Sequence, residues 1–151
     1  MKKYTIRKNH KKTILQVFNE KKGKDLVIIV HGLGGFKEQP HIQLMADVFK
    51  RHNYTVLIYD ACYSIGESSG SLLNATLTRH YQCLNNVIKW TKQQSWYKQP
   101  FILVGHSLGS AACILYAEKN PNDIKAIAPT SAFISGKEFK KSIIRRGVYY
   151  A

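Results

Sequence analysis

The chain has 151 residues, of which 44% are hydrophobic and 21% are charged. This composition provides apolar material for one hydrophobic core, so we expect a single domain over residues 1–151. The longest aliphatic run, residues 26–30, is far too short to cross a bilayer, and the basic N-terminus lacks the apolar segment of a secretory signal. These features argue against a membrane-spanning or signal-directed secreted protein.

The formal net charge is +14, and basic residues gather at both ends of the chain. They are Lys2, Lys3, Arg7, Lys8, Lys11 and Lys12 at the start, and Lys137, Lys140, Lys141, Arg145 and Arg146 at the end. Such a charge can attract nucleic acid or an anionic surface without sequence preference. However, the chain has no RNP-like, zinc-finger or helix-turn-helix signature. We therefore interpret these residues as solvated surface and predict no specific nucleic-acid partner.

The chain has three cysteines, an odd number, and no Cys-x-x-Cys pair among them; they are Cys62, Cys83 and Cys113. This argues against a disulfide framework and a zinc site, so we expect a reduced, cytoplasmic protein with no metal or cofactor. Each thiol is interpreted as a small buried hydrophobe. For Cys62, which follows a predicted strand, a reactive thiol is the alternative.

The first half of the chain predicts an antiparallel strand pair followed by alternating strands and helices. The pair covers residues 4–7 and 13–18 and turns around Asn9 and His10. Residues 25–30 form a continuous aliphatic run of the kind buried on both faces of a parallel sheet. A helix begins near Pro40, because apolar residues then recur at helical spacing, and residues 55–59 form the next strand.

The second half continues this alternation after a Ser- and Gly-rich loop over residues 60–73. The elements expected are a helix around residues 77–88, a strand at 101–104, an apolar helix at 111–117, a strand at 124–128 and a basic helix at 137–146. Strands that alternate with helices imply parallel βαβ units. We therefore predict a three-layer α/β domain.

The most informative motif is Gly105-His106-Ser107-Leu108-Gly109, which lies between a predicted strand and a predicted helix. In this context the Gly-x-Ser-x-Gly pattern predicts a nucleophile elbow, a sharp turn that presents the serine hydroxyl. Gly105 and Gly109 let the turn close. The alternative is a glycine-rich turn in which Ser107 only caps the helix.

A second glycine-rich segment, His31-Gly32-Leu33-Gly34-Gly35, directly follows the aliphatic strand. Loops at the carboxyl end of a parallel sheet can face a ligand, and glycines let backbone amides approach it closely. In the mechanism expected, Ser107 attacks a carbonyl and the backbone N–H groups of Leu33 and Leu108 stabilise the oxyanion. A plain glycine turn is the alternative for this segment.

Together these two motifs resemble the α/β-hydrolase superfamily, in the branch of serine aminopeptidase-like, feruloyl-esterase-like and monoacylglycerol-lipase-like proteins. The resemblance runs from about Thr13 to Phe133 and implies a mostly parallel sheet that is truncated after about the sixth strand. It also implies that residues 60–70 match the family's Asp-x-Arg-Gly-x-Gly-x-Ser loop. Gly66-Glu67-Ser68 is retained there, but Cys62-Tyr63-Ser64 replaces the Arg-Gly step.

All six histidines, at positions 10, 31, 41, 52, 80 and 106, precede Ser107. The superfamily places its catalytic histidine after the serine, so the triad acid and base are expected to be missing from this chain. His106 is adjacent to Ser107 and points elsewhere, whereas His31 is expected to support the oxyanion loop. Asp123 is expected to be a surface residue rather than the triad acid.

Three functional hypotheses follow. The first is the N-terminal part of a serine hydrolase that acts on a small ester or amide and needs a complementing C-terminal fragment. The second is a non-catalytic remnant that binds a partner, or a second copy of itself, through the exposed edge strand at residues 124–128. The third and weakest is a basic protein that binds nucleic acid or an anionic surface.

Overall fold

The computed structural model describes residues 1–20, 22–132 and 135–137. Six strands and three α-helices form this part of the chain. They are β1 (Lys2–Lys8), β2 (Lys11–Phe18), β3 (Leu26–Val30), α1 (Pro40–Arg51), β4 (Thr55–Tyr59), α2 (Leu77–Thr91), β5 (Phe101–His106), α3 (Leu108–Lys119) and β6 (Ile124–Thr130). The basic helix predicted over residues 137–146 falls, beyond its first residue, outside the described part.

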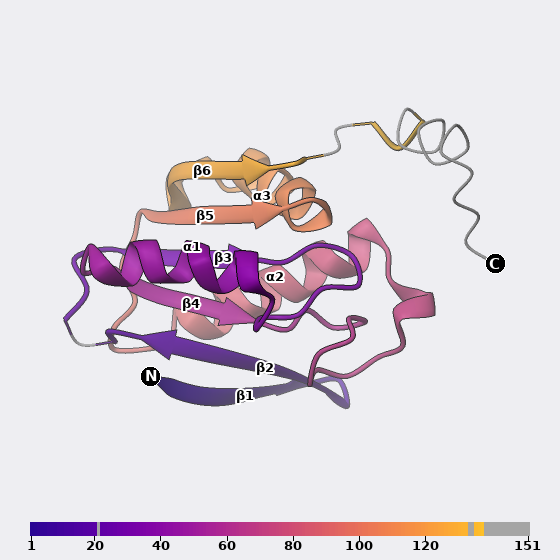
Figure 1. Ribbon diagram of the computed structural model, residues 1–151, viewed down its shortest axis with the longest axis horizontal. Coiled ribbons are helices and arrows are strands. Elements are labelled where there is room, and N and C mark those ends of the chain that lie inside the picture. Colours follow the sequence, from indigo (N-terminus) through magenta and orange to yellow (C-terminus); the bar gives the residue numbers. More distant parts are fainter. Residues whose placement is uncertain (21, 133–134, 138–151) are drawn as a thin grey trace.

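All six strands belong to one sheet with the order β1-β2-β4-β3-β5-β6 (Figure 1). The central strands β4, β3, β5 and β6 run parallel, whereas β1 and β2 pair antiparallel with each other and β2 pairs antiparallel with β4. Every residue of β3 and β4 is buried, as expected of continuous aliphatic strands in the middle of a covered sheet. The predicted mostly parallel sheet is confirmed.

β1 and β2 form a hairpin whose turn lies at Asn9 and His10, as predicted. Both residues adopt left-handed backbone conformations, with φ angles of 49° and 60°. Two consecutive positive φ angles are the mark of a tight two-residue hairpin turn, and Asn tolerates them well. Pairing therefore continues up to Lys8 and Lys11, so both strands are longer than the apolar alternation alone predicted.

Helices cover both faces of the sheet, which gives the predicted three layers (Figure 1). Alternate residues of β3 point to opposite faces: Leu26, Ile28 and Val30 pack in a core with residues of α2 and α3. Val27 and Ile29 pack in a second core with residues of α1. The two cores therefore occupy the two faces of the sheet. A ligand site is then expected in the loops at the carboxyl ends of the parallel strands.

Candidate active site

Ser107 occupies the turn between β5 and α3 with an unusual backbone conformation, φ 52° and ψ −116°. A non-glycine residue with positive φ is strained, and such strain costs on the order of 1–3 kcal/mol and concentrates at functional sites. Ser107 is the residue that precedes the helix, but its side chain makes no capping hydrogen bond. The geometry therefore favours a projecting hydroxyl over the capping alternative.

The two glycines of this turn allow close backbone approaches. A Cβ atom added at Gly105 would lie 2.5 Å from Ser110 Cα, and one added at Gly109 would lie 2.3 Å from the carbonyl oxygen of Val30. Real Cβ atoms do not approach other atoms this closely. Glycine is therefore required where α3 presses against β5 and against the end of β3.

Thr130, the last residue of the neighbouring strand β6, forms hydrogen bonds with residues of the turn around Ser107. Its carbonyl oxygen accepts hydrogen bonds from the Ser107 amide and from the Ser110 hydroxyl, each at 2.9 Å. Its own hydroxyl donates to the Gly105 carbonyl at 2.7 Å. A threonine at a strand end carries no sequence signal of this role.

The glycine-rich loop after β3 lies directly beside Ser107. A Cβ atom added at Gly32 would lie 3.1 Å from both Ser107 Cβ and the His106 carbonyl oxygen. Gly34 adopts the left-handed conformation, with φ 63°, and Gly35 donates its amide to the Gly32 carbonyl. Within the described residues, the amides of Leu33 and Leu108 donate to no protein acceptor.

His31 is buried and fully engaged by hydrogen bonds. Its Nε2 accepts from the Ala61 amide at 2.9 Å, so its Nδ1 carries the proton and donates to the Gly32 carbonyl at 2.8 Å. Burial lowers the pKa of His31, against the raising effect of its backbone hydrogen bond. The ring thus links the glycine-rich loop after β3 to the segment after β4, and both of its nitrogens are already engaged.

His80, on α2, was not identified from the sequence. It is buried, and its Nε2–H donates to the His31 carbonyl at 2.9 Å. Burial, followed by the neighbouring His31, lowers the pKa of His80 to about 4. The folded protein therefore keeps a neutral ring at pH values where a free histidine, with a pKa of about 6.5, is already protonated.

This pKa difference predicts acid sensitivity. Between about pH 6.5 and pH 4 the unfolded chain binds a proton that folded His80 does not, so the free energy of unfolding should fall as pH falls, by up to about 3 kcal/mol. We expect His80→Gln, which can still donate to the His31 carbonyl, to reduce this slope in denaturant titrations, while buried His31 keeps its own contribution. The variant His52→Gln, at an exposed site, serves as the control. An unchanged slope in His80→Gln would contradict the assignment.

None of the six histidines hydrogen-bonds to Ser107 Oγ. The ring of His106 packs against that of His41, with ring centroids 4.4 Å apart. Asp123 lies at the start of β6, whereas Ser107 follows the end of the parallel neighbour β5. The expectation of a surface position for Asp123 was wrong, because the residue is buried. Its carboxylate accepts hydrogen bonds from the Tyr116 hydroxyl and the Lys92 ammonium, which cover it.

Lys37 and Asp60 form a buried ion pair beside these loops. The Lys37 ammonium lies 2.8 Å from the Asp60 carboxylate, with both side chains 0% exposed, and also binds Glu67 and Glu38. Burial disfavours its charge, but the hydrogen bonds to Asp60, Glu38 and Glu67 more than offset this and raise the pKa of Lys37. Asp60 also accepts the backbone amides of Lys37 and Glu67, so the pair joins the loop before α1 to the loop after β4.

The described residues contain no group of three or more His, Cys, Asp or Glu side chains that could hold a metal ion. Nor, within them, does any helix have the length and apolar character needed to traverse a membrane.

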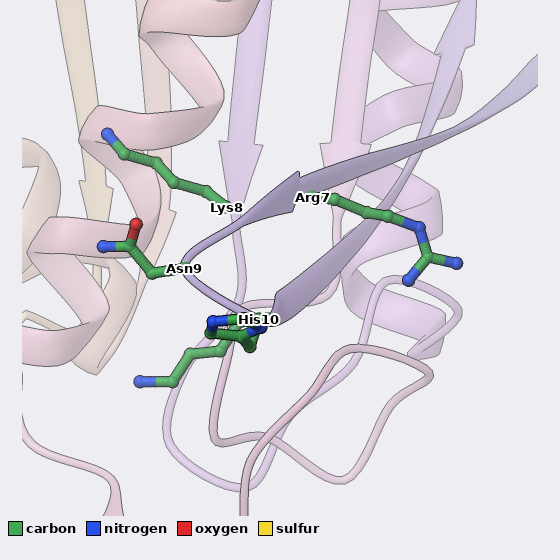
Figure 2. Close-up of a pocket in the computed structure, with 5 residues that line it drawn as sticks. Arg7, Lys8, Asn9 and His10 are labelled. Atoms are coloured by element: carbon green, nitrogen blue, oxygen red, sulfur yellow. The ribbon is translucent and has the colours of Figure 1, made fainter.

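The basic hairpin turn, with Arg7, Lys8, Asn9 and His10, lines a surface hollow of about 410 Å³ (Figure 2). Its side chains diverge, with Arg7 pointing away from Lys8 and Asn9, so they do not converge on one ligand.

Comparisons with known proteins agree with this geometry. Residues 25–144 match the sequence profile of the alpha/beta hydrolase fold. No curated protein matches the chain. Among solved structures, Est1E from Butyrivibrio proteoclasticus with bound ferulic acid is similar at 24% identity and a TM-score of 0.79, over 85% of this chain and 52% of that one.

Two further solved structures show the same fold. The Pyrococcus furiosus esterase Pf2001 has 17% identity and a TM-score of 0.76, over 99% of this chain and 63% of its own. The mouse alpha/beta hydrolase domain-containing protein 10 has 17% identity and a TM-score of 0.73, over 97% and 60%. The chain thus spans between half and two thirds of the length of these structures. Its sheet order, its helical layers and the profile match agree, and the chain belongs to the α/β hydrolase fold family.

Proposed function

We propose that this chain contributes the nucleophile and the oxyanion hole of a serine hydrolase. Ser107 attacks the carbonyl carbon of an acyl substrate, and the amides of Leu33 and Leu108 stabilise the negative charge that develops on the carbonyl oxygen. The observation that carries this proposal is the strained backbone of Ser107, whose hydroxyl is not used as a helix cap. His31, Gly32, Gly34, Gly35, Gly105, His106 and Gly109 shape the two loops around it.

The substrate class that we propose is a small carboxylic ester or amide. Two of the similar structures support an ester: Est1E, which holds ferulic acid, and Pf2001, which is described as an esterase. The reaction needs no metal or cofactor, because a serine nucleophile and backbone donors supply the chemistry. We place this protein in the reducing cytoplasm, the setting in which free cysteines such as its three are ordinarily found.

We propose that the general base is not one of the six histidines described, because none of them hydrogen-bonds to Ser107 Oγ. In serine hydrolases, loss of the base lowers kcat by a factor of about 10⁶. The oxyanion hole and substrate binding still give a rate roughly 10³ to 10⁴ times that of the reaction in water. We propose that a complementing C-terminal polypeptide supplies the histidine and its acidic partner. The chain alone should therefore react slowly at Ser107.

A fluorophosphonate probe with added imidazole tests this proposal, because imidazole can replace a missing histidine base. We expect slow labelling of the chain alone, faster labelling with imidazole, and loss of both in Ser107→Ala. Peptide mass spectrometry locates the adduct. The variant Ser95→Ala, at an exposed serine, should label like the original chain. Two results would contradict the nucleophile assignment. One is labelling that persists in Ser107→Ala, and the other is an original chain that shows no labelling even with imidazole.

The second candidate is a non-catalytic protein that binds through β6. Among the described residues β6 pairs only with β5, and Ile127 on it is 40% exposed. An open edge of this kind can add a strand from a partner or a second copy, although Pro129 removes one donor. An unlabelled Ser107 together with a dimer in light scattering would favour this candidate.

The weaker basic-surface candidate predicts DNA binding that disappears at moderate salt.

A further inference from the structure

Cys62 and Cys83 form a close pair away from the glycine-rich loops. Cys62 lies shortly after β4, and Cys83 lies on α2. Their sulfur atoms are 3.4 Å apart, and both side chains are mostly buried, at 9% and 2% exposed. The sequence gives no sign of this contact, because the two residues are not in a Cys-x-x-Cys motif.

The surroundings of the pair make the two sulfurs unequal. The Cys83 thiol donates toward Cys62 Sγ, and the Thr13 hydroxyl lies 3.3 Å from the same sulfur. These hydrogen bonds, from Cys83 first and then from Thr13, lower the pKa of Cys62 despite its burial, and the charge of Lys11 acts in the same direction. The pKa of Cys83 is raised. Cys62 is therefore the sulfur that loses its proton more readily, although the Cys62 amide also donates to Cys83 Sγ at 3.1 Å.

A narrow cavity connects Cys62 to the basic hairpin turn. It has a volume of about 120 Å³, and its lining includes Lys8, Lys11, Thr13, Cys62 and Asn86. Lys8, which projects from the turn in Figure 2, donates to the Asn86 side chain at 2.8 Å. The cavity is large enough for a molecule of the size of water or hydrogen peroxide. Cys113, by contrast, is 1% exposed and is not part of this lining.

We propose that Cys62 and Cys83 are a peroxide-oxidised pair in which Cys62 is attacked first and Cys83 resolves it into a disulfide. The Cys62 thiolate attacks one oxygen of hydrogen peroxide, the O–O bond breaks, and the leaving hydroxide takes a proton to become water. The product is a sulfenic acid at Cys62. Cys83 then gives up its proton and attacks the Cys62 sulfur, the S–O bond breaks, and a second water leaves. Two thiols are oxidised and one peroxide is reduced to two waters.

The sulfur atoms would move from 3.4 Å to about 2 Å, a shift of side-chain scale. The new bond would tie the segment after β4 to α2. That segment also contains Ala61, whose amide binds His31, so oxidation would fix one support of the oxyanion loop. This modification does not depend on the proposed hydrolase reaction.

Peptide mapping of the full chain after treatment with stoichiometric hydrogen peroxide tests the proposal. Trypsin places each cysteine in its own peptide: residues 52–79 carry Cys62, residues 80–89 carry Cys83, and residues 99–119 carry Cys113. After free thiols are alkylated, we expect peptides 52–79 and 80–89 to be linked and Cys113 to be recovered as a free thiol. Reduction with dithiothreitol should separate the linked peptides.

The variant Cys83→Ser tests the order of the two steps. We expect it to accumulate a sulfenic acid at Cys62, which a cyclic 1,3-dione traps on peptide 52–79, while Cys113→Ser should still form the linked pair. Circular dichroism checks that both variants fold. Peptides that stay unlinked in the unaltered chain, or oxidation of Cys113 as readily as Cys62, would overturn the proposal. A dione adduct on Cys83 in Cys62→Ser, with none on Cys62 in Cys83→Ser, would also overturn it.

Discussion

Lys37→Met is expected to lower the free energy of unfolding by about 3–5 kcal/mol, because it leaves the Asp60 carboxylate buried without its counter-ion. Both side chains are 0% exposed, so water cannot replace the lost ammonium without opening the structure. The loops before α1 and after β4 meet at this pair. The variant should therefore lose stability and also loosen the segment that supports His31.

Urea unfolding followed by circular dichroism measures this loss. Lys125→Met is a matched control, because Lys125 forms an ion pair with Asp25 at 2.7 Å but is 50% exposed, and exposed pairs contribute about 0–1 kcal/mol. The double variant Lys37→Met/Asp60→Asn removes the stranded charge and should recover part of the stability. Equal losses in Lys37→Met and Lys125→Met would show that the buried pair has no special role.

Gly109→Ala is expected to be strongly disruptive, with a loss of about 3 kcal/mol. The added Cβ would lie 2.3 Å from the Val30 carbonyl oxygen and 2.5 Å from that of His31. Both are backbone atoms, so no side chain can rotate away to relieve the contact. Helix α3 would have to move away from β3, and Ser107 would separate from the glycine-rich loop after β3.

Thermal unfolding and fluorophosphonate labelling measure the two consequences of Gly109→Ala. We expect a lower Tm and slower labelling of Ser107 with imidazole. Gly136→Ala is the control, because a Cβ there meets nothing within 4 Å. A Gly109→Ala chain as stable as Gly136→Ala would contradict the tight contact between α3 and β3.

The elements that sequence predicts well here are those whose pattern follows from burial alone. The continuous aliphatic run at β3 requires cover on both faces, and the spacing of Ile42 and Ala46 gives α1 one apolar face, so the layered fold could be inferred. The position of Ser107 between a strand and a helix also follows from the sequence, while its role as a nucleophile stays a prediction.

The supports of the candidate site could not be predicted, because they depend on contacts between distant segments. Lysine is rarely buried, so nothing in the sequence indicates that Lys37 lies beneath a carboxylate. His80 lies on a helix with ordinary amphipathic spacing, and only the packing of α2 against the sheet brings its ring to the His31 carbonyl. Asp123 was misjudged for the same reason, since its partner Lys92 directly follows α2 and its partner Tyr116 lies on α3.

The three hydrogen bonds of Thr130 have a consequence for synthesis on the ribosome. The turn at Ser107 is strained, and part of what holds it is a strand that is made later in the chain. While residues up to α3 have emerged and β6 has not, the serine has no reason to keep its left-handed conformation. We therefore expect the turn at Ser107 to acquire its shape late, after Thr130 has left the exit tunnel and β6 has docked beside β5.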